Sequence, residues 1–471
     1  MEKQQRFLEL VFRCTGTLTH THTKFQDEVV TPAGAAAVKH VRVVPPVSGA
    51  AVPLPADCAP FAGVGGFAGS PFFVRYYADD GVLVEGRFFN DGRRLLRATE
   101  SLASDHFRLL GERGPSQPPL LSQAKITDWD TRLEVLGWIL DTQALTVTMT
   151  ERKQQKLLRL LDEWPRSRTV ATVKQISQLS GFLLHVSFAL RPGKFFVERV
   201  LAAAGMPLSH AGSLPPDTDS HRRVGLGPEF HDDLDFWRCF VQIGLVARGS
   251  RFSSPMYNIV LRPPTFSMFS DASKTAVGGF CVETSRFWRY DLAPEECQRF
   301  CGSSEMVVGV NDISINALEL LGMVLSSWML TIVGNFRPNA FGDCILLRGD
   351  NDSAVAWFRR CRGGKEPRSG ALMRLMGVLE VSSGWHFQAQ HVPGVLNSVA
   401  DGISRWPRES ILSNLAAAYP NQPWQETDIG LSGRHLCTSV LGSSSSGTLL
   451  RHRLRQLIAD TSARGCFSAL T

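Results

Sequence analysis

The chain has 471 residues, of which 44% are hydrophobic and 20% are charged, so it is long enough to bury several cores. This composition excludes a wholly disordered chain, a collagen-like repeat and a short disulfide scaffold. Lysine and arginine total 50 against 44 aspartate and glutamate, and the resulting net charge of +6 is compatible with a polyanionic partner. No apolar run reaches the ~20 residues that a membrane-spanning helix needs.

The ten cysteines form no Cys-x-x-Cys pair, which argues against a zinc ribbon or a thioredoxin-like site. We interpret them as free thiols of a reducing compartment. The N-terminus is also a poor signal peptide, because charged residues interrupt its brief apolar patch. These features predict an intracellular protein of the cytoplasm or nucleus with no membrane partner, and they leave its oligomeric state unknown.

The N-terminal third divides into an irregular segment and a strand-rich one. Residues 1–66 form an atypical, low-order segment, because 32–66 are rich in Ala, Gly, Pro and Val without a sustained period. We interpret the Thr-His repeat at 19–22 as a solvated polar strip, and we expect periodic structure from about residue 70. The predicted elements of residues 67–149 are a hairpin (71–77 and 81–85, turning at 78–80), a helix (91–110) and a strand pair (135–140 and 145–149).

Residues 150–207 have the period of helices, over 150–164 and again over 170–190. Residues 151–200 hold ten Lys/Arg against four Asp/Glu, an excess equal to that of the whole chain. A basic charge concentrated on helices favours contact with a phosphate backbone, and a solvated helix face is the alternative. Residues 208–263 are typical of a linker or connection, and 407–471 form a polar, serine-rich tail with one helix at 448–460.

Residues 264–406 alternate strands with helices, which predicts an α/β domain. Four carboxylates stand at its strand ends and helix starts: Asp271, Glu319, Asp350 and Asp401. Such residues can converge on one point, and Mg²⁺ prefers an all-oxygen site of this kind. Two ions about 3.5–4 Å apart can bind both the attacking and the leaving oxygen in phosphodiester cleavage. Taken singly, each acid could equally be a cap, a turn former or a surface helix residue.

The order of these acids and the short sequences around them, over about 265–406, resemble the ribonuclease H domain of retroelement reverse transcriptases. The resemblance implies a mixed five-stranded sheet and a two-metal Mg²⁺ site, with Mn²⁺ as an alternative, formed by the four acids. It implies that Asn316 contacts an RNA–DNA hybrid and that His391, ten residues before Asp401, assists product release. Asn316 and Asn351 are candidate donors to the 2′-hydroxyl that distinguishes RNA from DNA, and either could instead bond backbone.

The motif Tyr77-Ala78-Asp79-Asp80 resembles the YxDD signature of the reverse-transcriptase palm, whose paired aspartates hold Mg²⁺. Leu136-Gly137-Trp138 resembles the strand that grips the primer, so Gly137 and Trp138 are candidate contacts to a template-primer. The basic helices of 150–207 then correspond to the thumb, with candidate nucleic-acid contacts at Lys153, Lys156 and Arg159. By the same resemblance, 67–149 is a partial palm with an RNA-directed DNA polymerase origin.

The chain departs from the polymerase pattern at its third carboxylate, and this departure decides whether we expect polymerase activity. The family's third carboxylate usually lies on a strand some 70 or more residues before the paired aspartates, and no such strand precedes Asp79. Asp27 and Asp57 are the only earlier aspartates, and both have unsuitable surroundings. We therefore expect an N-terminally truncated polymerase without activity.

The sequences of motifs such as Gly349-Asp350-Asn351-Asp352 and Ala400–Arg405 look most like those of DIRS-type retrotransposons. In these elements a tyrosine recombinase follows the ribonuclease H. The tail 407–471 is then either the start of a recombinase region or a linker with a stray helix. The sequence thus predicts a multi-domain α/β protein: a partial palm and a helical thumb, followed by a ribonuclease H-like domain. Its predicted activity is Mg²⁺-dependent hydrolysis of RNA in RNA–DNA hybrids, and the alternative is a non-catalytic nucleic-acid-binding remnant.

Overall fold

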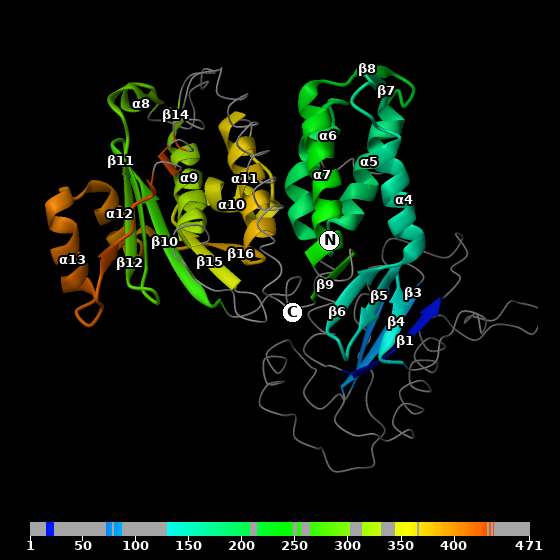
Figure 1. Cartoon of the computed structure of the whole chain (residues 1–471), viewed down its shortest axis with the longest axis horizontal. Coiled ribbons are helices and arrows are strands. Elements are labelled where there is room, and N and C mark those ends of the chain that lie inside the picture. Colours follow the sequence, from blue (N-terminus) through cyan, green and yellow to red (C-terminus); the bar gives the residue numbers. More distant parts are fainter. Residues whose placement is uncertain are drawn as a thin grey trace, which may run out of the picture. The chain divides into compact units, whose positions relative to one another are not determined.

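The computed structural model describes the following residues: 16–22, 72–77, 80–86, 130–207, 214–247, 252–255, 264–301, 313–330, 344–364, 367–430, 433–434 and 437. The chain divides into two compact units, residues 1–156 with 253–261 and residues 157–252 with 262–471 (Figure 1). The helices expected over 91–110 and 448–460 lie outside the described residues. The predicted boundaries at 66, 149, 207 and 263 stay predictions.

The first unit contains a small antiparallel sheet with the strand order β1-β3-β2, formed by β1 (Gly16–His22), β2 (Phe72–Tyr77) and β3 (Asp80–Gly86). Tyr77 pairs with Asp80, so the predicted hairpin formed by these two strands is confirmed. β1 pairs with β3 and places His22 opposite Asp80. Our expectation of periodic structure only from about residue 70 is therefore wrong for 16–22. The strand carries no apolar alternation, because hydrogen bonding to β3 rather than a hydrophobic pattern defines it.

A second antiparallel sheet of this unit has the order β4-β5-β6-β9. Its strands are β4 (Arg132–Val135), β5 (Trp138–Asp141), β6 (Thr146–Met149) and β9 (Ser253–Pro255). The single strand expected over 135–140 is wrong, because Leu136 and Gly137 have φ of 53° and 76° and form the turn between β4 and β5. Positive φ at both central residues is typical of a type I′ hairpin, for which glycine is well suited.

A largely helical segment of the chain follows, and the boundary between the units falls within its first helix. The elements are α4 (Glu151–Asp162), β7 (Val170–Thr172), α5 (Val173–Val186), the 3₁₀ helix η3 (Arg191–Phe196), α6 (Glu198–Ala202), β8 (Arg223–Gly225) and α7 (Pro228–Ala247). Thr172 begins α5 with a reciprocal capping box to Gln175, which satisfies two backbone donors. The helical pattern is thus confirmed, and the segment expected to be a linker contains the long helix α7.

The main sheet of the second unit has the order β16-β15-β10-β11-β12-β17. Its strands are β10 (Phe266–Ala272), β11 (Ala276–Cys281), β12 (Arg286–Asp291), β15 (Cys344–Gly349), β16 (His386–His391) and β17 (Gln425–Glu426). β10, β11 and β12 form an antiparallel meander, whereas β15 and β16 run parallel to β10. The predicted mixed sheet of an α/β fold is confirmed, with the short β17 added at its edge.

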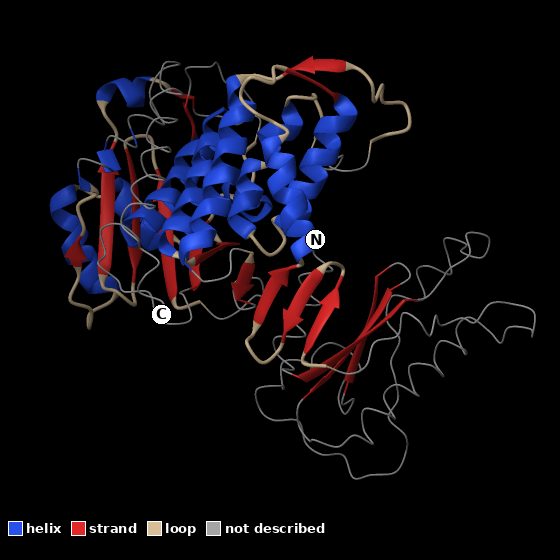
Figure 2. Ribbon diagram, turned by 45° about the vertical axis from the view of Figure 1, so that its right-hand side comes forward, coloured by secondary structure: helices blue, strands red, loops and turns tan. Residues whose placement is uncertain are grey.

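Helices cover both faces of this sheet (Figure 2). The remaining elements of this part of the chain are α8 (Pro294–Gln298), α9 (Ile315–Trp328), α10 (Asp352–Arg360), α11 (Pro367–Ser383), α12 (Ser398–Arg405) and α13 (Ile411–Ala418), with the shorter β13 (Phe300–Cys301), β14 (Ile313–Ser314), η7 (Gly394–Leu396) and η8 (Arg408–Ser410). Gly322 of α9 packs against Val277, whereas Gly278 faces Ile403 of α12. Because successive strand residues point to opposite faces, α9 and α12 lie on opposite sides of β11.

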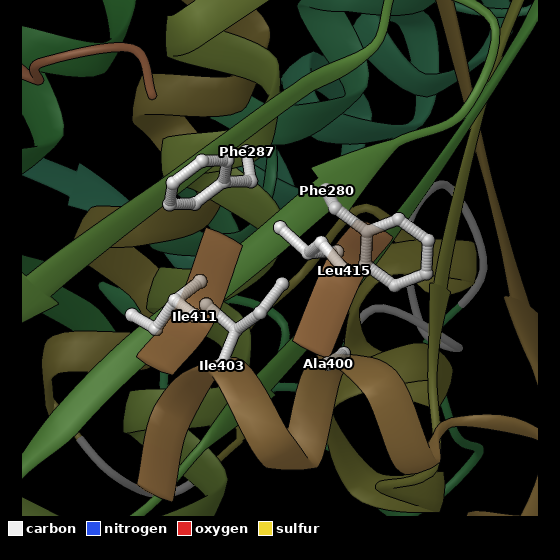
Figure 3. Packing of buried hydrophobic residues seen from close by; sticks show 6 residues of the cluster. All are labelled: Phe280, Phe287, Ala400, Ile403, Ile411 and Leu415. Carbon is white, nitrogen blue, oxygen red and sulfur yellow. The ribbon is translucent and has the colours of Figure 1, made fainter. Parts of the chain in front are cut away.

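The sheet and its core continue past residue 406, where the sequence analysis ended the domain. α13 packs with α12 and the inner strands in one hydrophobic cluster (Figure 3), formed by Phe280, Phe287, Ala400, Ile403, Ile411 and Leu415. Arg408 bonds Asp291 at 2.7 Å, and β17 pairs with β12. The boundary at 406 is therefore corrected. An eight-residue helix with two buried apolar residues is too short to give a clear signal in a polar tail.

The segment of α6, α7 and η3 shares a core with α11 of the same unit. Phe196 stacks on Phe236 of α7, and a side chain on Gly377 of α11 would collide with Phe195 and Phe196. Arg191 of η3 forms a buried ion pair with Glu380 of α11. The segment is therefore packed into this unit as part of its core.

The described residues can be compared with two expectations, on membrane-spanning helices and on the cysteines. None of the helices that the structure describes is long and apolar enough to cross a membrane. The described cysteines are free thiols: Cys239, Cys281, Cys297, Cys344, Cys361 and Cys437.

Candidate metal centre

Three carboxylates from three elements meet at one edge of the main sheet. Asp271 is the penultimate residue of β10, Glu319 lies in α9 and Asp350 follows β15, and one oxygen of each lies within 4.8 Å of the others. β10 and β15 are parallel neighbours, so their carboxyl ends bring Asp271 and Asp350 to the same edge. Asp271 is 3% exposed and Glu319 is 6% exposed, which is exceptional for acids without a buried cation beside them.

The electrostatics of this cluster suit a divalent cation. Burial raises the pKa of Asp271 to about 7; the hydrogen bond from Ser404 opposes this rise, and the charges of Asp350 and Asp401 add to it. Burial, followed by the charges of Asp271 and Asp350, raises the pKa of Glu319 well above its ordinary value. Like charges held together out of water are stabilised by protons or by a cation. An all-oxygen set of this kind fits Mg²⁺ or Mn²⁺ by ligand type.

Local structure fixes Glu319 within the cluster. Ser314 caps α9 by accepting a hydrogen bond from the Ala317 backbone N–H at 3.2 Å, which defines where the helix starts. The helix is buried along almost its whole length, so its rotation is fixed by packing. The backbone N–H of Ala272 then donates to Oε1 of Glu319 at 3.3 Å. The glutamate is therefore held against the end of β10.

Asp401 was expected as the fourth member of the set, and the structure places it beside the cluster rather than in it. It lies in the first turn of α12, its side chain is 41% exposed, and Arg405 binds it at 2.8 Å. Its charge still contributes to the raised pKa of Asp271. The arginine pair reduces what Asp401 can offer a cation, so three acids form the core of the candidate site and the fourth stands next to it.

Ser404 is a residue of this site that sequence reasoning missed. It is fully buried, and its hydroxyl donates to Oδ2 of Asp271 at 2.7 Å and lies 2.9 Å from the carbonyl of Asp401. Ser273 in turn donates to the carbonyl of Ser404 at 2.9 Å. A serine three residues after Asp401 lies on nearly the same helix face, and that spacing was the available signal.

Asn397 is the second missed residue. It is 1% exposed, and its Nδ2 donates to the carbonyl of Ser270 at 3.1 Å, one residue before Asp271. Its own carbonyl accepts from the backbone N–H of Asp401 at 3.0 Å. It therefore connects the start of α12 to the end of β10. Nothing in the local sequence distinguishes this asparagine from an ordinary helix cap.

The predicted polar residues around the acids lie close to them. Nδ2 of Asn351 donates to Oδ1 of Asn316 at 2.8 Å, and Oδ1 of Asn351 accepts from the backbone of Ala354, so Asn351 also caps α10. Nε2 of His391 lies 3.0 Å from the carbonyl of Asp350 and 3.8 Å from a carboxylate oxygen of Asp352. The structure thus brings Asn316, Asn351 and His391 to the rim of the cluster.

The candidate residues of the first unit have different surroundings. Asp79 lies outside the described residues, and Asp80 is described only as the first backbone position of β3. Trp138 is 2% exposed, so its indole belongs to the core of this unit and offers no surface to nucleic acid. Burial and the charge of Arg152 lower the pKa of Lys153 to about 8, and its Nζ donates to the carbonyl of Leu136 at 2.7 Å.

Gly137 has a structural reason to be glycine, besides its predicted role. A Cβ at this position would lie 2.2 Å from Cε of Lys153, and its φ is positive. The lysine therefore closes over the turn between β4 and β5. Lys156 and Arg159 are exposed on α4, and their contact with nucleic acid stays a prediction.

Comparisons with known proteins give a limited likeness. No family model matches the chain, and no curated protein matches it. A solved foamy viral protease-reverse transcriptase in complex with double-stranded DNA matches at a TM-score of 0.25 and 10% identity over 68% of this chain. Another, in complex with an RNA/DNA hybrid, matches at 0.28 and 9% over 81%. The chain spans 46% and 45% of these proteins, and such TM-scores do not establish a shared fold.

Proposed function

We propose that this chain derives from a retroelement and hydrolyses the RNA strand of RNA–DNA hybrids with the help of divalent cations. The observation that carries the proposal is the cluster of Asp271, Glu319 and Asp350 within 4.8 Å at the end of a mixed sheet. Its acids come from the first strand, the first long helix and the next parallel strand of the sheet. The order of these acids is the one for which the sequence resembles ribonuclease H.

The three acids would hold the cation, and Asp401 would join them if Arg405 moved aside. A divalent cation bound there supplies Lewis-acid chemistry to a phosphodiester and offsets the charge of its oxygens. The chain itself contributes the position of each oxygen: Ser404 orients Asp271, and the Ala272 backbone orients Glu319. These supports hold the carboxylates in one geometry before the substrate binds, which avoids reorganisation during the reaction.

The polar rim would recognise the hybrid. The Asn316–Asn351 amide pair lies beside Asp350, where a phosphate of the RNA strand would be held, so it can reach the adjacent 2′-hydroxyl. Nε2 of His391 lies 3.0 Å from the carbonyl of Asp350 and the side chain is partly exposed, so the ring would lie next to a phosphate bound at the acids. Its assignment to product release rests on the resemblance alone.

The polymerase part of the proposal is narrower. The resemblance to a palm and thumb assigns the hairpin of β2 and β3 and the basic helix α4 to binding template-primer. Lys156 and Arg159, exposed on α4, are the residues best placed for phosphate contacts in that reading. We propose nucleic-acid binding for this region and no polymerase activity.

The test is cleavage of an end-labelled RNA–DNA hybrid in Mg²⁺ by the whole chain and by Asp350→Asn. The parent is expected to give product, whereas the variant is expected to bind the hybrid without cutting it, because an amide is a poorer ligand for a cation. Asp428→Asn is the matched control, since Asp428 is 74% exposed and lies in another segment. Cleavage retained in Asp350→Asn would contradict the assignment.

A second candidate function is favoured by one observation. Arg405 binds Asp401 at 2.8 Å, so the fourth acid is engaged outside the cluster. If that pair persists, the chain would bind hybrids without cutting them. Binding that weakens steeply with salt, together with no product in either Mg²⁺ or Mn²⁺, would support this non-catalytic reading.

A further inference from the structure

Among the residues that the structure describes, few large apolar side chains are exposed. They are Val170 at 39%, Val395 at 81%, Leu396 at 68% and Leu412 at 51%. The two most exposed of these are neighbours in η7. Single exposed apolar residues are ordinary. Two adjacent ones expose a larger apolar surface to water, and burying that surface against a ligand would be favourable.

The exposed pair lies in a loop that is anchored at both ends to the candidate metal centre. On one side, His391 lies 3.0 Å from the Asp350 carbonyl, and the backbone N–H of Val392 donates to Gly349 at 3.0 Å. On the other side, the buried Asn397 donates to Ser270 at 3.1 Å. The residues next to the loop thus contact the backbones that carry Asp350 and Asp271.

The loop also touches a ligand carboxylate itself. A Cβ on Gly394 would lie 3.3 Å from Oδ2 of Asp350, so the backbone just before the apolar pair runs against this acid. The anchors on both sides restrict the loop, and Leu396 and Asn397 each donate a backbone hydrogen bond within it. The pair is therefore an exposed apolar surface held at the rim of the acid cluster.

We propose that Val395 and Leu396 form an apolar contact for the sugar next to the phosphodiester that the acid cluster holds. The proposal rests on the proposed function, because the occupant is the hybrid. Each phosphate of a nucleic acid is flanked by two sugars, whose C–H faces are the nearest apolar surface to it. The wide, shallow minor groove of an A-like duplex presents those sugars to a protein surface.

A nucleic acid is a better occupant of this surface than a protein. Stable protein interfaces bury on the order of 1,000 Å² or more, which two side chains do not provide. The pair also lies beside a site whose chemistry suits phosphate and cations, so an occupant of the acid cluster must pass next to it. Contact with a sugar would increase the affinity for the hybrid and fix its position at the acids, and it involves no charged group.

The experiment measures steady-state hybrid cleavage by the whole chain and by the double variant Val395→Ser/Leu396→Ser. KM is expected to rise about tenfold, as for the loss of roughly one buried apolar side chain, and kcat is expected to stay within about twofold. The slope of log KM against log salt should not change, because the contact releases no counterions. Leu412→Ser, on α13, is the matched control and should behave like the parent.

The outcomes separate the inference from the proposed function. If the parent cleaves and the double variant keeps the parent's KM, the sugar contact is refuted and the ribonuclease activity stands. If the parent binds no hybrid, both proposals fail. If the double variant cleaves normally but loses a concentration-dependent self-association of the parent in sedimentation, the surface serves a second copy of the chain, and the inference is also overturned.

Discussion

Two regions of the second unit bury carboxylates in different ways. In the acid cluster, Asp271, Glu319 and Asp350 face one another, and the pKa values of Asp271 and Glu319 are raised. Near η3 and α11, each buried acid instead has an arginine. Glu380 pairs with Arg191 and accepts from the Phe387 backbone at 3.2 Å, whereas Asp233 accepts from Nε of Arg199 at 3.0 Å.

This difference separates buried carboxylates whose charge the fold neutralises from buried carboxylates whose charge it leaves uncompensated. A buried carboxylate that an arginine neutralises is satisfied by the fold itself. A buried group of like charges is not, and the chain holds it in place with Ser404 and the Ala272 backbone at the expense of stability. The cluster is therefore where an external cation has most to contribute.

The largest expected effect comes from the same substitution made in both regions. Glu380→Gln leaves Arg191 buried without its countercharge, and we expect the free energy of unfolding to fall by about 3–5 kcal/mol. Glu319→Gln removes one of several repelling charges, so we expect unchanged or higher stability in chelator. Urea unfolding of the two variants and the parent measures both values. Equal destabilisation by the two substitutions would erase the distinction between the regions.

The next effect is stabilisation by the cation itself. Mn²⁺ at about 100 times its dissociation constant should stabilise the parent by about 2.7 kcal/mol, because it binds only the folded chain. Glu319→Gln should lose most of this gain, whereas Arg408→Lys should keep it, because Arg408 pairs with Asp291 and Glu426 rather than with the acid cluster. Thermal melts with and without EDTA give the comparison. A gain that survives in Glu319→Gln would place the cation elsewhere.

An effect that is smaller for each pH unit is the pH dependence of the free energy of unfolding without cation. The folded pKa of Asp271 is raised to about 7, above its unfolded value, so the folded state holds a proton that the unfolded chain releases. Stability from this group is present at low pH and is lost as the pH rises toward 7, at no more than about 1.4 kcal/mol per pH unit. Unfolding in EDTA at several pH values, parent against Asp271→Asn, isolates the slope. A variant with the parent's slope would exclude Asp271 as its source.

The smallest expected effect concerns Ser404. Ser404→Ala removes the donor that orients Asp271, and we expect Mn²⁺ affinity to weaken about tenfold, as for other supporting hydrogen bonds at metal sites. Isothermal titration of Mn²⁺ into the parent and the variant measures the change. Ser404→Thr keeps the hydroxyl and should restore part of the affinity. If alanine and threonine were equivalent, the hydrogen bond would have no role in binding.

The sequence predicted several structural features through local patterns. The strand and helix periods located α4, α5 and the β-strands that carry Asp271 and Asp350, because their apolar spacing is local information. The predictions from sequence failed where an element depends on contacts with residues far away in the chain or on an unusual backbone angle. β1 became a strand by pairing with β3, the strand at 135–140 split at a positive-φ turn, and α13 joined the core through contacts with Phe280 and Phe287.

The candidate site shows the same division. The residue types and the order of the acids, taken from the sequence, were enough to predict which carboxylates are candidate ligands of a divalent cation. Only the tertiary structure decided which of them meet: three converge, and Asp401 is drawn to Arg405. It also decided that Ser404 and Asn397 support the site, since each acts through a strand more than 120 residues away. Contacts across such separations depend on how the sheet and helices pack, and no local pattern encodes that.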